Sequence, residues 1–294
     1  MIKVGDENMK KVVILGAGIE AKVIANTLAE NSDFDIYVIG NPNTSNLTQY
    51  SKVEIPGITS HEVNISYEKS NDIGDYSNYH DKVSSLMNIM ESTISYSKIG
   101  SKDKVYLIKN KAEFNSRVTS VNLALSKIKL NENEKTVYFE TDEGQEDLPF
   151  NYDLLINTIP LKNFLSYTDY DCSGLEFKYK MIYEISIPNI DFNREEVDNI
   201  VVFYDADPSS QFYRHNSYCS GTNVISLSSF TLSRIESSKI IYPGKIVKTE
   251  ILDSVVNNLE YIFPSLKMIG SFARWDYNFG IEKVYECAKN LIKN

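Results

Sequence analysis

Three small residues near the N-terminus have the spacing of a phosphate-binding turn. Gly16 and Gly18 flank Ala17, and Ala21 follows three residues after Gly18. In such a turn Gly16 permits the tight bend, Gly18 lets the backbone approach a pyrophosphate, and a small residue such as Ala21 lets the following helix pack closely. The chemistry that this pattern predicts is the binding of a dinucleotide. A strand, turn and helix that bind no ligand form the alternative interpretation.

The segments on either side of this turn have the apolar patterns of the elements that must position it. The run Val12–Leu15 predicts a buried strand before the turn, and Ile24, Ala25 and Leu28 lie on one face of a predicted helix after it. The first turn of a helix has backbone N–H groups without intrahelical acceptors, and here they would face the phosphates. This context favours a nucleotide site more strongly than the glycines alone.

The end of the second predicted strand lacks the acid of a typical dinucleotide site. That strand is Phe34–Ile39, and the position that usually carries Asp or Glu for the adenosine ribose is Gly40, followed by Asn41. Only amide or hydroxyl contacts to the ribose remain. No arginines crowd Gly40 in the sequence, so selection of a nicotinamide cofactor with a 2′-phosphate has little support.

The length of the chain limits its number of domains, and its net charge limits the kinds of molecule that it could bind. The chain has 294 residues, 42% of them hydrophobic, which suffices for one large or two modest domains. Its formal net charge of −10 argues against general electrostatic binding to nucleic acid or to an acidic membrane surface. No run approaches the ~18 apolar residues of a membrane-spanning helix, and the charged N-terminus does not resemble a signal peptide. We expect a small-molecule substrate.

The cysteines and histidines predict neither disulfide bridges nor a metal centre. Cys172, Cys219 and Cys287 are far apart and form no CxxC pair, which fits a reducing, cytoplasmic location. The three histidines are also too far apart in sequence for a local metal motif.

The middle of the chain predicts a small helical region followed by strands. Asp81–Ser97 has apolar residues at helical spacing, and the polar stretch Ser66–Tyr79 before it predicts an excursion over the surface that could cap a site. Short strands are expected at Val118–Val121, Thr136–Glu140 and Leu154–Ile156, as a meander that returns to a buried parallel strand.

The second half of the chain predicts an antiparallel sheet and two helices. The helices lie within Lys248–Ile262, which ends before Pro264, and within Ser271–Asn294, where Gly280 stands just before the helix. Four strands are expected in the sheet: Tyr179–Ile187, Ile200–Tyr204, Gln211–Tyr218 and Val224–Ser229.

Arg214 is the candidate side chain for binding an anionic substrate. Its planar guanidinium suits a phosphate or a carboxylate, although a strand arginine in a surface ion pair is the alternative. Tyr213 is a weaker candidate and is more often a core tyrosine. In a regular strand, Tyr213 and His215 would point away from the face of Arg214, so His215 and Arg214 should not line one pocket.

Four separated segments resemble, in the same order, one family of flavoproteins. The family includes UDP-galactopyranose mutase and the amine-oxidase and protoporphyrinogen-oxidase-like enzymes. The first segment is Gly16–Gly18, and the second is Tyr152–Leu161, YDLLINTIPL, which looks like the family strand whose backbone passes the FAD. The third, Asp207–Arg214, DPSSQFYR, is similar to the mutase segment whose arginine reaches the substrate pyrophosphate. The fourth, Gly270–Glu282, GSFARWDYNFGIE, resembles the return of the chain to the FAD domain.

Some positions differ from the family pattern. Ser271 stands where the mutases carry an arginine that contacts the flavin, and Asn278 stands where they usually carry a leucine. The chain is also shorter than typical members, so the middle helical domain would be reduced to about residues 50–115.

The resemblance implies an α/β fold with three parts. Residues 1–50, 116–165 and 264–294 would form a Rossmann-type domain that binds FAD. Residues 51–115 would form a small helical insertion, and residues 166–263 an antiparallel substrate domain.

The resemblance also implies a function and a set of site residues. The chain would be an FAD-dependent oxidoreductase or mutase that acts on a nucleotide-linked sugar or a small amine, with Arg214 binding the substrate anion. Arg274 and Trp275 would lie beside the flavin ring, unless Trp275 fills the core between the domains. The residues expected to contact the FAD are Gly16, Ala17, Gly18, Ile19, Glu20, Ala21, Asn41, Val118, Thr158, Gly270, Trp275, Gly280, Ile281 and Glu282.

Two other functions stay open at this point. One is a nucleotide-binding sensor or complex subunit that keeps the fold without flavin chemistry. The other is an NAD(P)-dependent oxidoreductase, although the C-terminal return to the nucleotide domain is more typical of flavoproteins.

Overall fold

A computed structural model defines the helices and strands of most of the chain. It describes residues 9–31, 33–41, 50–70, 100–109, 112–123, 127–140, 148–168, 170–187, 197–205, 212–219, 224–229, 239–246 and 248–293. The described α-helices are α1 (Ile19–Asn31), α3 (Leu161–Tyr167), α4 (Glu250–Ile262) and α5 (Ile281–Lys293).

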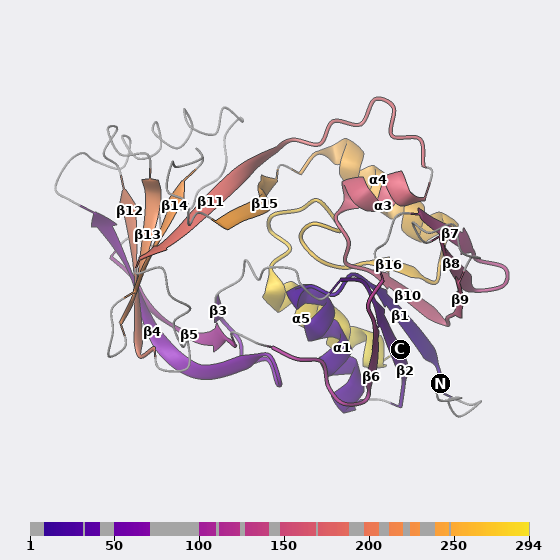
Figure 1. The fold of residues 1–294 in the computed structure, drawn as a ribbon, viewed down its shortest axis with the longest axis horizontal. Coiled ribbons are helices and arrows are strands. Elements are labelled where there is room, and N and C mark those ends of the chain that lie inside the picture. Colours follow the sequence, from indigo (N-terminus) through magenta and orange to yellow (C-terminus); the bar gives the residue numbers. More distant parts are fainter. Residues whose placement is uncertain are drawn as a thin grey trace.

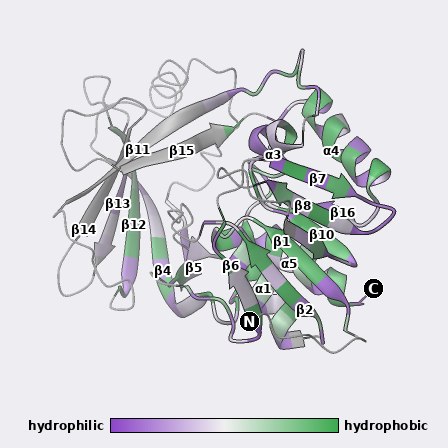
Figure 2. Ribbon diagram, turned by 45° about the vertical axis from the view of Figure 1, so that its right-hand side comes forward, coloured by the Kyte–Doolittle hydropathy of each residue, from purple (hydrophilic) through white to green (hydrophobic). Residues whose placement is uncertain are grey.

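The first sheet is parallel and contains the predicted N-terminal strands. Its strand order is β16 (Leu266–Met268), β10 (Leu154–Asn157), β1 (Lys11–Leu15), β2 (Asp35–Ile39) and β6 (Val118–Val121). All four pairings are parallel, as expected for strands covered on both faces. The central strands β1 and β10 are mostly hydrophobic (Figure 2).

Two apolar cores cover the two faces of this parallel sheet (Figure 1). On one face α1 and α5 pack against each other and against β1 and β2, through residues such as Ile24, Leu28 and Val284. The opposite face carries α3 and α4 together with a three-stranded antiparallel sheet. That small sheet comprises β7 (Lys127–Asn131), β8 (Thr136–Glu140) and β9 (Leu148–Asn151).

Local sequence signals explain where α4 begins and which face it buries. Thr249 caps the helix, because its side chain accepts a hydrogen bond from the Leu252 amide at 3.3 Å. Glu250 and Asp253 lie in the first turn, where acidic side chains interact favourably with the positive end of the helix dipole. Leu252 and Leu259 are buried in the core on the same face of the sheet as α3.

The second sheet has eight strands among the described residues and stands to one side of the parallel sheet (Figure 1). Its order is β15 (Lys239–Ile246), β11 (Tyr179–Ile187), β14 (Val224–Ser229), β13 (Phe212–Cys219), β12 (Asn199–Asp205), β4 (Thr59–Ser70), β5 (Lys102–Ile108) and β3 (Tyr50–Ser51). The strands expected in the second half of the chain are therefore present. The sheet is mixed rather than purely antiparallel, because β12 pairs with β4 in parallel.

The described part of residues 51–115 does not form the expected helical insertion. β4 and β5 pair with each other and extend the large sheet, and β3 pairs with β5. Every second residue of β4 is buried on one face: Val63, Ile65 and Tyr67. This alternation is typical of a strand with one buried face, and it explains why the segment is not helical. The expected helix Asp81–Ser97 lies outside the described residues, and so do residues 71–79 of the expected surface excursion. Residues 66–70 belong to β4.

The expected meander also differs in its first strand. β6 joins the parallel sheet beside β2 instead of leading into β8. The antiparallel partners of β8 are β7 and β9, which were not expected. The parallel strand β10 follows this small sheet, as predicted.

Candidate functional site

The Gly16–Gly18 turn lies at the carboxyl edge of the parallel sheet, where the ends of several strands meet. The Gly16 amide donates to the carbonyl oxygen of Ile39, the last residue of β2, at 2.8 Å. The Thr158 amide and hydroxyl both donate to the Leu15 carbonyl oxygen, at 2.9 and 2.7 Å. Ligands of open α/β sheets bind outside the carboxyl ends of the strands, so this edge is the candidate cofactor site.

Gly16 and Gly40 are glycines because of close packing around this turn. Gly16 has a φ of +97°, and a Cβ there would overlap the hydroxyl of Thr158. A Cβ on Gly40 would lie 3.1 Å from both the Ala17 amide nitrogen and the Gly16 Cα. An acid at position 40 would therefore press on the turn itself. This packing is a physical reason for the absence of the usual ribose-binding acid.

The start of α1 has the donors that a phosphate requires. Within the described part of the chain, no acceptor is found for the backbone N–H groups of Ala17 and Gly18. Ile19 and Ala21 turn their side chains into the core beneath, where both are buried. The turn thus presents backbone N–H groups and no bulky side chain from those two positions.

Glu20 reaches from the first turn of α1 to the segment that follows β16. Its Oε1 accepts hydrogen bonds from the Ser271 amide at 2.8 Å and from the Ser271 hydroxyl at 2.9 Å. Burial raises the pKa of the Glu20 carboxyl from 4.5 to about 7, and the two Ser271 donors lower it in part. A Cβ on Gly270, whose φ is +126°, would overlap the Glu20 carboxylate. Glu20 and Gly270 are both predicted cofactor residues, and their direct contact follows from the fold and not from any sequence pattern.

The predicted segment Thr158–Leu161 is locked to the same edge. The buried Asn157 side chain accepts from the Ile159 amide and donates to the Ile159 carbonyl, at 3.1 and 3.0 Å. The Leu161 amide donates to the Phe272 carbonyl at 2.8 Å, which ties this turn to the C-terminal return. The second and fourth segments of the resemblance therefore meet beside the first.

The start of α5 contacts the large sheet. Gly280 precedes the helix, Ile281 is buried in the core beside α1, and Glu282 accepts a 2.9 Å hydrogen bond from the Lys52 amide. Lys52 follows directly after β3, so this carboxylate joins the helix N-terminus to the edge of the eight-stranded sheet.

Two residues that were expected to contact the cofactor do not lie with the other site residues at the carboxyl edge of the sheet. Val118 pairs with Ile36 at the start of β6, three residues before Val121, which is the β6 residue opposite Ile39. The Val121 carbonyl accepts from the Gly40 amide at 3.1 Å, so Val121 lies at the carboxyl edge and Val118 does not. Asn41 follows Gly40 and is exposed to solvent. The sequence alone does not give the register of β6, which determines that Val121 and not Val118 reaches this edge.

Trp275 fills the space between the parallel sheet and the start of the large sheet. Its side chain is 1% exposed and packs edge to face against Phe177 and Tyr179, with ring centroids 5.1 and 6.0 Å away. Arg274 is held by the Met268 carbonyl and by Glu260, at 3.2 and 3.4 Å. These contacts match the interpretation in which Trp275 is a core residue.

Arg214 stands on a face of the large sheet that carries tyrosines. It pairs with Tyr204 of β12, and its Nε donates to Asn216 Oδ1 at 2.9 Å. Burial raises the pKa of the Tyr204 hydroxyl, while the charge of Arg214 lowers it and those of Tyr50 and Tyr277 raise it. Tyr277 belongs to the segment between β16 and α5, so one of the groups that influence the Tyr204 pKa comes from outside the large sheet.

His215 lies on the opposite face of β13, as the strand geometry predicts. It pairs with Phe203, and its Nε2 is 3.2 Å from Oδ2 of the buried Asp205. His215 and Arg214 therefore do not share a site. The Tyr213 side chain lies outside what the structure describes.

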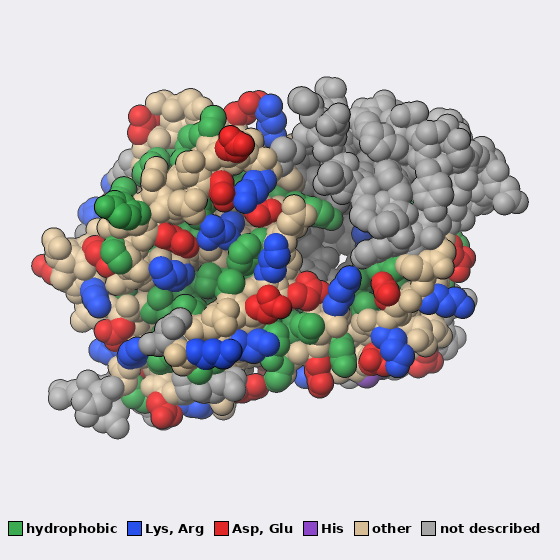
Figure 3. All heavy atoms as spheres, turned by 180° about the vertical axis from the view of Figure 1, so that it is seen from behind, with side chains coloured by type: hydrophobic (Ala, Val, Ile, Leu, Met, Phe, Trp, Pro, Cys, Tyr) green, Lys and Arg blue, Asp and Glu red, His purple; other side chains and the backbone are tan. Residues whose placement is uncertain are grey.

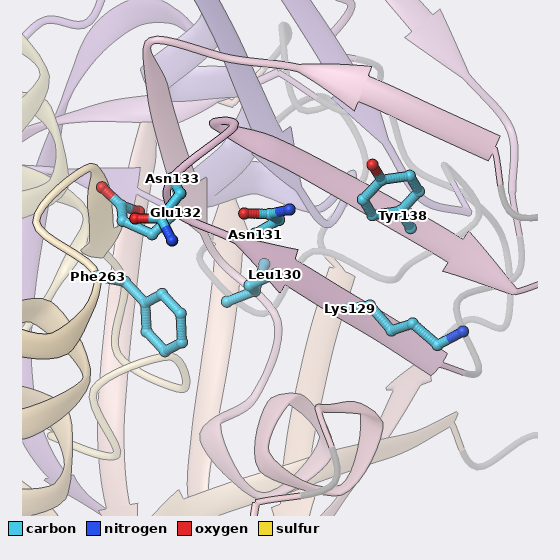
Figure 4. Close-up of a pocket in the computed structure, with 7 residues that line it drawn as sticks. All are labelled: Lys129, Leu130, Asn131, Glu132, Asn133, Tyr138 and Phe263. Carbon is cyan, nitrogen blue, oxygen red and sulfur yellow. The ribbon is translucent and has the colours of Figure 1, made fainter.

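A shallow pocket of about 490 Å³ lies away from the candidate site (Figure 4). It is formed by the β7–β8 hairpin together with Phe263, and its polar lining includes Lys129, Glu132 and Tyr138. None of the residues that line it belongs to the Gly16–Gly18 turn or to the C-terminal return. The pocket is therefore separate from the strand ends that form the candidate cofactor site.

The described residues show a surface of mixed charge and no membrane-spanning helix. On the face shown in Figure 3, basic and acidic side chains are interspersed. No helix in the described residues is both long enough and apolar enough to cross a membrane.

No family model matches this chain, and no curated protein matches it.

Comparison by structure finds the fold in proteins of known structure. Over 97% of this chain and 94% of the other, it is similar to a reduced UDP-galactopyranose mutase, with a TM-score of 0.56 and 12% identity. A putative protoporphyrinogen oxidase from Exiguobacterium sp. 255-15 matches with a TM-score of 0.55 and 9% identity, over 98% and 99% of the two chains. A thermophilic tryptophan halogenase from Streptomycin violaceusniger matches with a TM-score of 0.54 and 12% identity, over 97% and 74%. The chain therefore shares its fold with these solved structures, which include the kinds of enzyme that its four motifs resemble.

Proposed function

We propose that this chain is an FAD-dependent enzyme that acts on a nucleotide-linked sugar or a small amine. One observation carries the proposal. The Gly16–Gly18 turn, the Thr158–Leu161 turn and the Gly270–Phe272 return meet at the carboxyl edge of one parallel sheet, joined by the hydrogen bonds of Thr158, Leu161 and Ser271. A dinucleotide would lie across these segments, because ligands of open α/β sheets bind outside the carboxyl ends of the strands.

The backbone at this edge fits the pyrophosphate of a dinucleotide. The N–H groups of Ala17 and Gly18, without acceptors among the described residues, would hold the phosphate oxygens at the positive end of α1. The N–H groups that start α5 at Ile281 would lie toward the flavin end of the cofactor. The flavin, when bound, would supply the electron transfer or the nucleophile of the reaction.

The protein's own residues would bind and orient the substrate. Arg214, on the face that carries Tyr204, has the charge to hold a phosphate or carboxylate group. Tyr277, in the C-terminal return, contributes to the raised pKa of the Tyr204 hydroxyl.

A nucleotide-binding protein without flavin chemistry is the second candidate. Gly40 favours it, because no acid follows β2 to hold the adenosine ribose.

The absorption spectrum of the purified protein, before and after reconstitution with FAD, separates the two candidates. We expect visible flavin absorption and recovery of FAD after denaturation. We expect Gly18→Val to lose the cofactor, because its side chain would fill the space of the pyrophosphate. Gly100→Ala is the control: a Cβ there meets no atom within 4 Å, so only its left-handed φ of +81° should cost stability, and FAD binding should be kept.

Three outcomes would contradict the proposal. A colourless protein that does not take up FAD would do so, as would tight binding of ADP or NAD in calorimetry without binding of FAD. Turnover with NADH in the absence of flavin would instead favour a nicotinamide-dependent oxidoreductase.

A further inference from the structure

Glu20 is a carboxyl placed where the candidate cofactor site needs positive potential. It lies two residues after Gly18, in the first turn of α1. Both Ser271 hydrogen bonds reach Oε1, and Oε2 lies against Gly270, where no Cβ could fit. The carboxyl is therefore fixed between the phosphate-binding turn and the C-terminal return.

The described surroundings of Glu20 supply no compensating cation. The charged groups on the elements packed against it are engaged elsewhere: Glu282 with the Lys52 amide, Arg274 with Glu260, Asp276 with Lys248, and Lys22 with the Phe114 ring. Burial is the largest influence on the Glu20 pKa, and the Ser271 donors that oppose it are neutral. A proton is the simplest way to remove this charge.

We propose that Glu20 makes binding of the anionic dinucleotide proton-linked, with one proton taken up at its carboxyl when the pyrophosphate binds to the Ala17–Gly18 amides. The inference rests on the proposed function. Two like charges in a partly desolvated site disfavour each other, so the pyrophosphate favours the protonated acid. Protonated Glu20 can still accept from Ser271 through one oxygen, and its other oxygen becomes a donor. Because the pKa of Glu20 is already about 7, the proton is available near neutral pH.

Calorimetric titration of the FAD-free protein with FAD tests the proposal. In the wild type we expect the affinity to fall by up to about tenfold for each unit of pH above about 7, which is the limit for uptake of one proton. Titrations in two buffers of different ionisation enthalpy should show about one proton taken up near pH 8. Riboflavin, which has no phosphate, should bind without this pH dependence.

Three variants separate Glu20 from other carboxyls. Glu20→Gln should bind FAD more tightly at about pH 8, with no proton uptake and a flat pH profile. Glu250→Gln removes an exposed acid from the first turn of α4 and should behave as the wild type. Ser271→Ala removes a donor that lowers the Glu20 pKa, so the pH profile should shift upward; this variant keeps the test decisive if Glu20→Gln fails to fold.

Two results would overturn the inference in distinguishable ways. FAD binding to the wild type with no proton uptake, and with the same pH profile as Glu20→Gln, would overturn the role of Glu20 while the proposed function stands. Absence of FAD binding in every variant at every pH would overturn both.

Discussion

The hydroxyl of Thr158 occupies the space that a Cβ on Gly16 would need, and a 2.7 Å hydrogen bond to the Leu15 carbonyl holds it there. Glycine at position 16 is therefore required by the protein's own packing before any ligand is considered. The same contact joins β10 to the end of β1, so the turn is shaped by a segment 142 residues later in the chain.

Gly16→Ala should destabilise the fold strongly. The added methyl would overlap Thr158, and a φ of +97° is unfavourable for any residue with a side chain. We expect a loss of about 2–4 kcal/mol in the free energy of unfolding, measured by urea denaturation. Gly100→Ala is the matched control: its φ is +81° and no atom lies within 4 Å, so it should cost only about 1 kcal/mol.

A double mutant separates the overlap from the backbone strain. Thr158→Ala removes the overlapping hydroxyl, so Gly16→Ala should cost less in that background than in the wild type. Additive losses would show that Thr158 does not set the requirement for glycine.

Substitutions of Trp275 should give an unusual order of stability. The residue has a φ of +52° and its side chain is 1% exposed. Trp275→Ala should lose about 3–5 kcal/mol of packing. Trp275→Gly should cost no more than Trp275→Ala, whereas glycine is usually worse by about 0.5–1 kcal/mol, because glycine relieves the left-handed conformation.

Trp275→Phe is the control for this series. No hydrogen-bond partner of the buried Trp275 Nε1 is found among the described residues, so phenylalanine loses volume without losing a hydrogen bond. It should be the mildest of the three in denaturation experiments. A clear advantage of alanine over glycine would contradict the assigned backbone conformation.

Glu20 should also make the stability of the ligand-free protein depend on pH. Below about pH 4.5 the carboxyl is protonated in both states, and between about 4.5 and 7 only the unfolded chain releases the proton. Relative to Glu20→Gln, the free energy of unfolding of the wild type should therefore fall as the pH rises through this window. The difference should be on the order of 2 kcal/mol, because solvent still reaches part of the side chain.

Denaturation of both proteins across this pH range measures the difference directly. Glu250→Gln, which removes an exposed acid, should follow the wild type. A constant difference between the wild type and Glu20→Gln would mean that the carboxyl has a similar pKa in the folded and unfolded states.

Strands with one clear burial pattern could be predicted from the sequence. β1 and β10 are continuous apolar runs because both faces of the parallel sheet are covered. β4 was missed because polar residues separate Val63, Ile65 and Tyr67, and alternation is a weaker signal than an apolar run. Its parallel pairing with β12 joins residues about 135 apart, which no local pattern reveals.

The candidate site was predictable in its segments and not in its contacts. The glycine spacing placed the turn before α1, and the resemblance named the two segments that reach it. The contact between Glu20 and Ser271 joins residues 251 apart and depends on how α1 faces the C-terminal return. The resemblance implies that Val118 contacts the cofactor, whereas the register of β6 brings Val121 to the edge. The Glu20–Ser271 contact and the register of β6 are both set by tertiary packing.

Arg214 should carry much of the affinity for an anionic substrate. With UDP as the probe, Arg214→Ala should weaken binding by about 2–5 kcal/mol if the guanidinium pairs with a buried phosphate. Arg214→Lys should recover part of this loss, since lysine keeps the charge but not the planar fork. Lys104→Ala is the control, because it removes an exposed cation that pairs with Glu62 on the same sheet. Unchanged affinity for UDP in Arg214→Ala would leave the arginine a structural role, through its 2.9 Å hydrogen bond to Asn216.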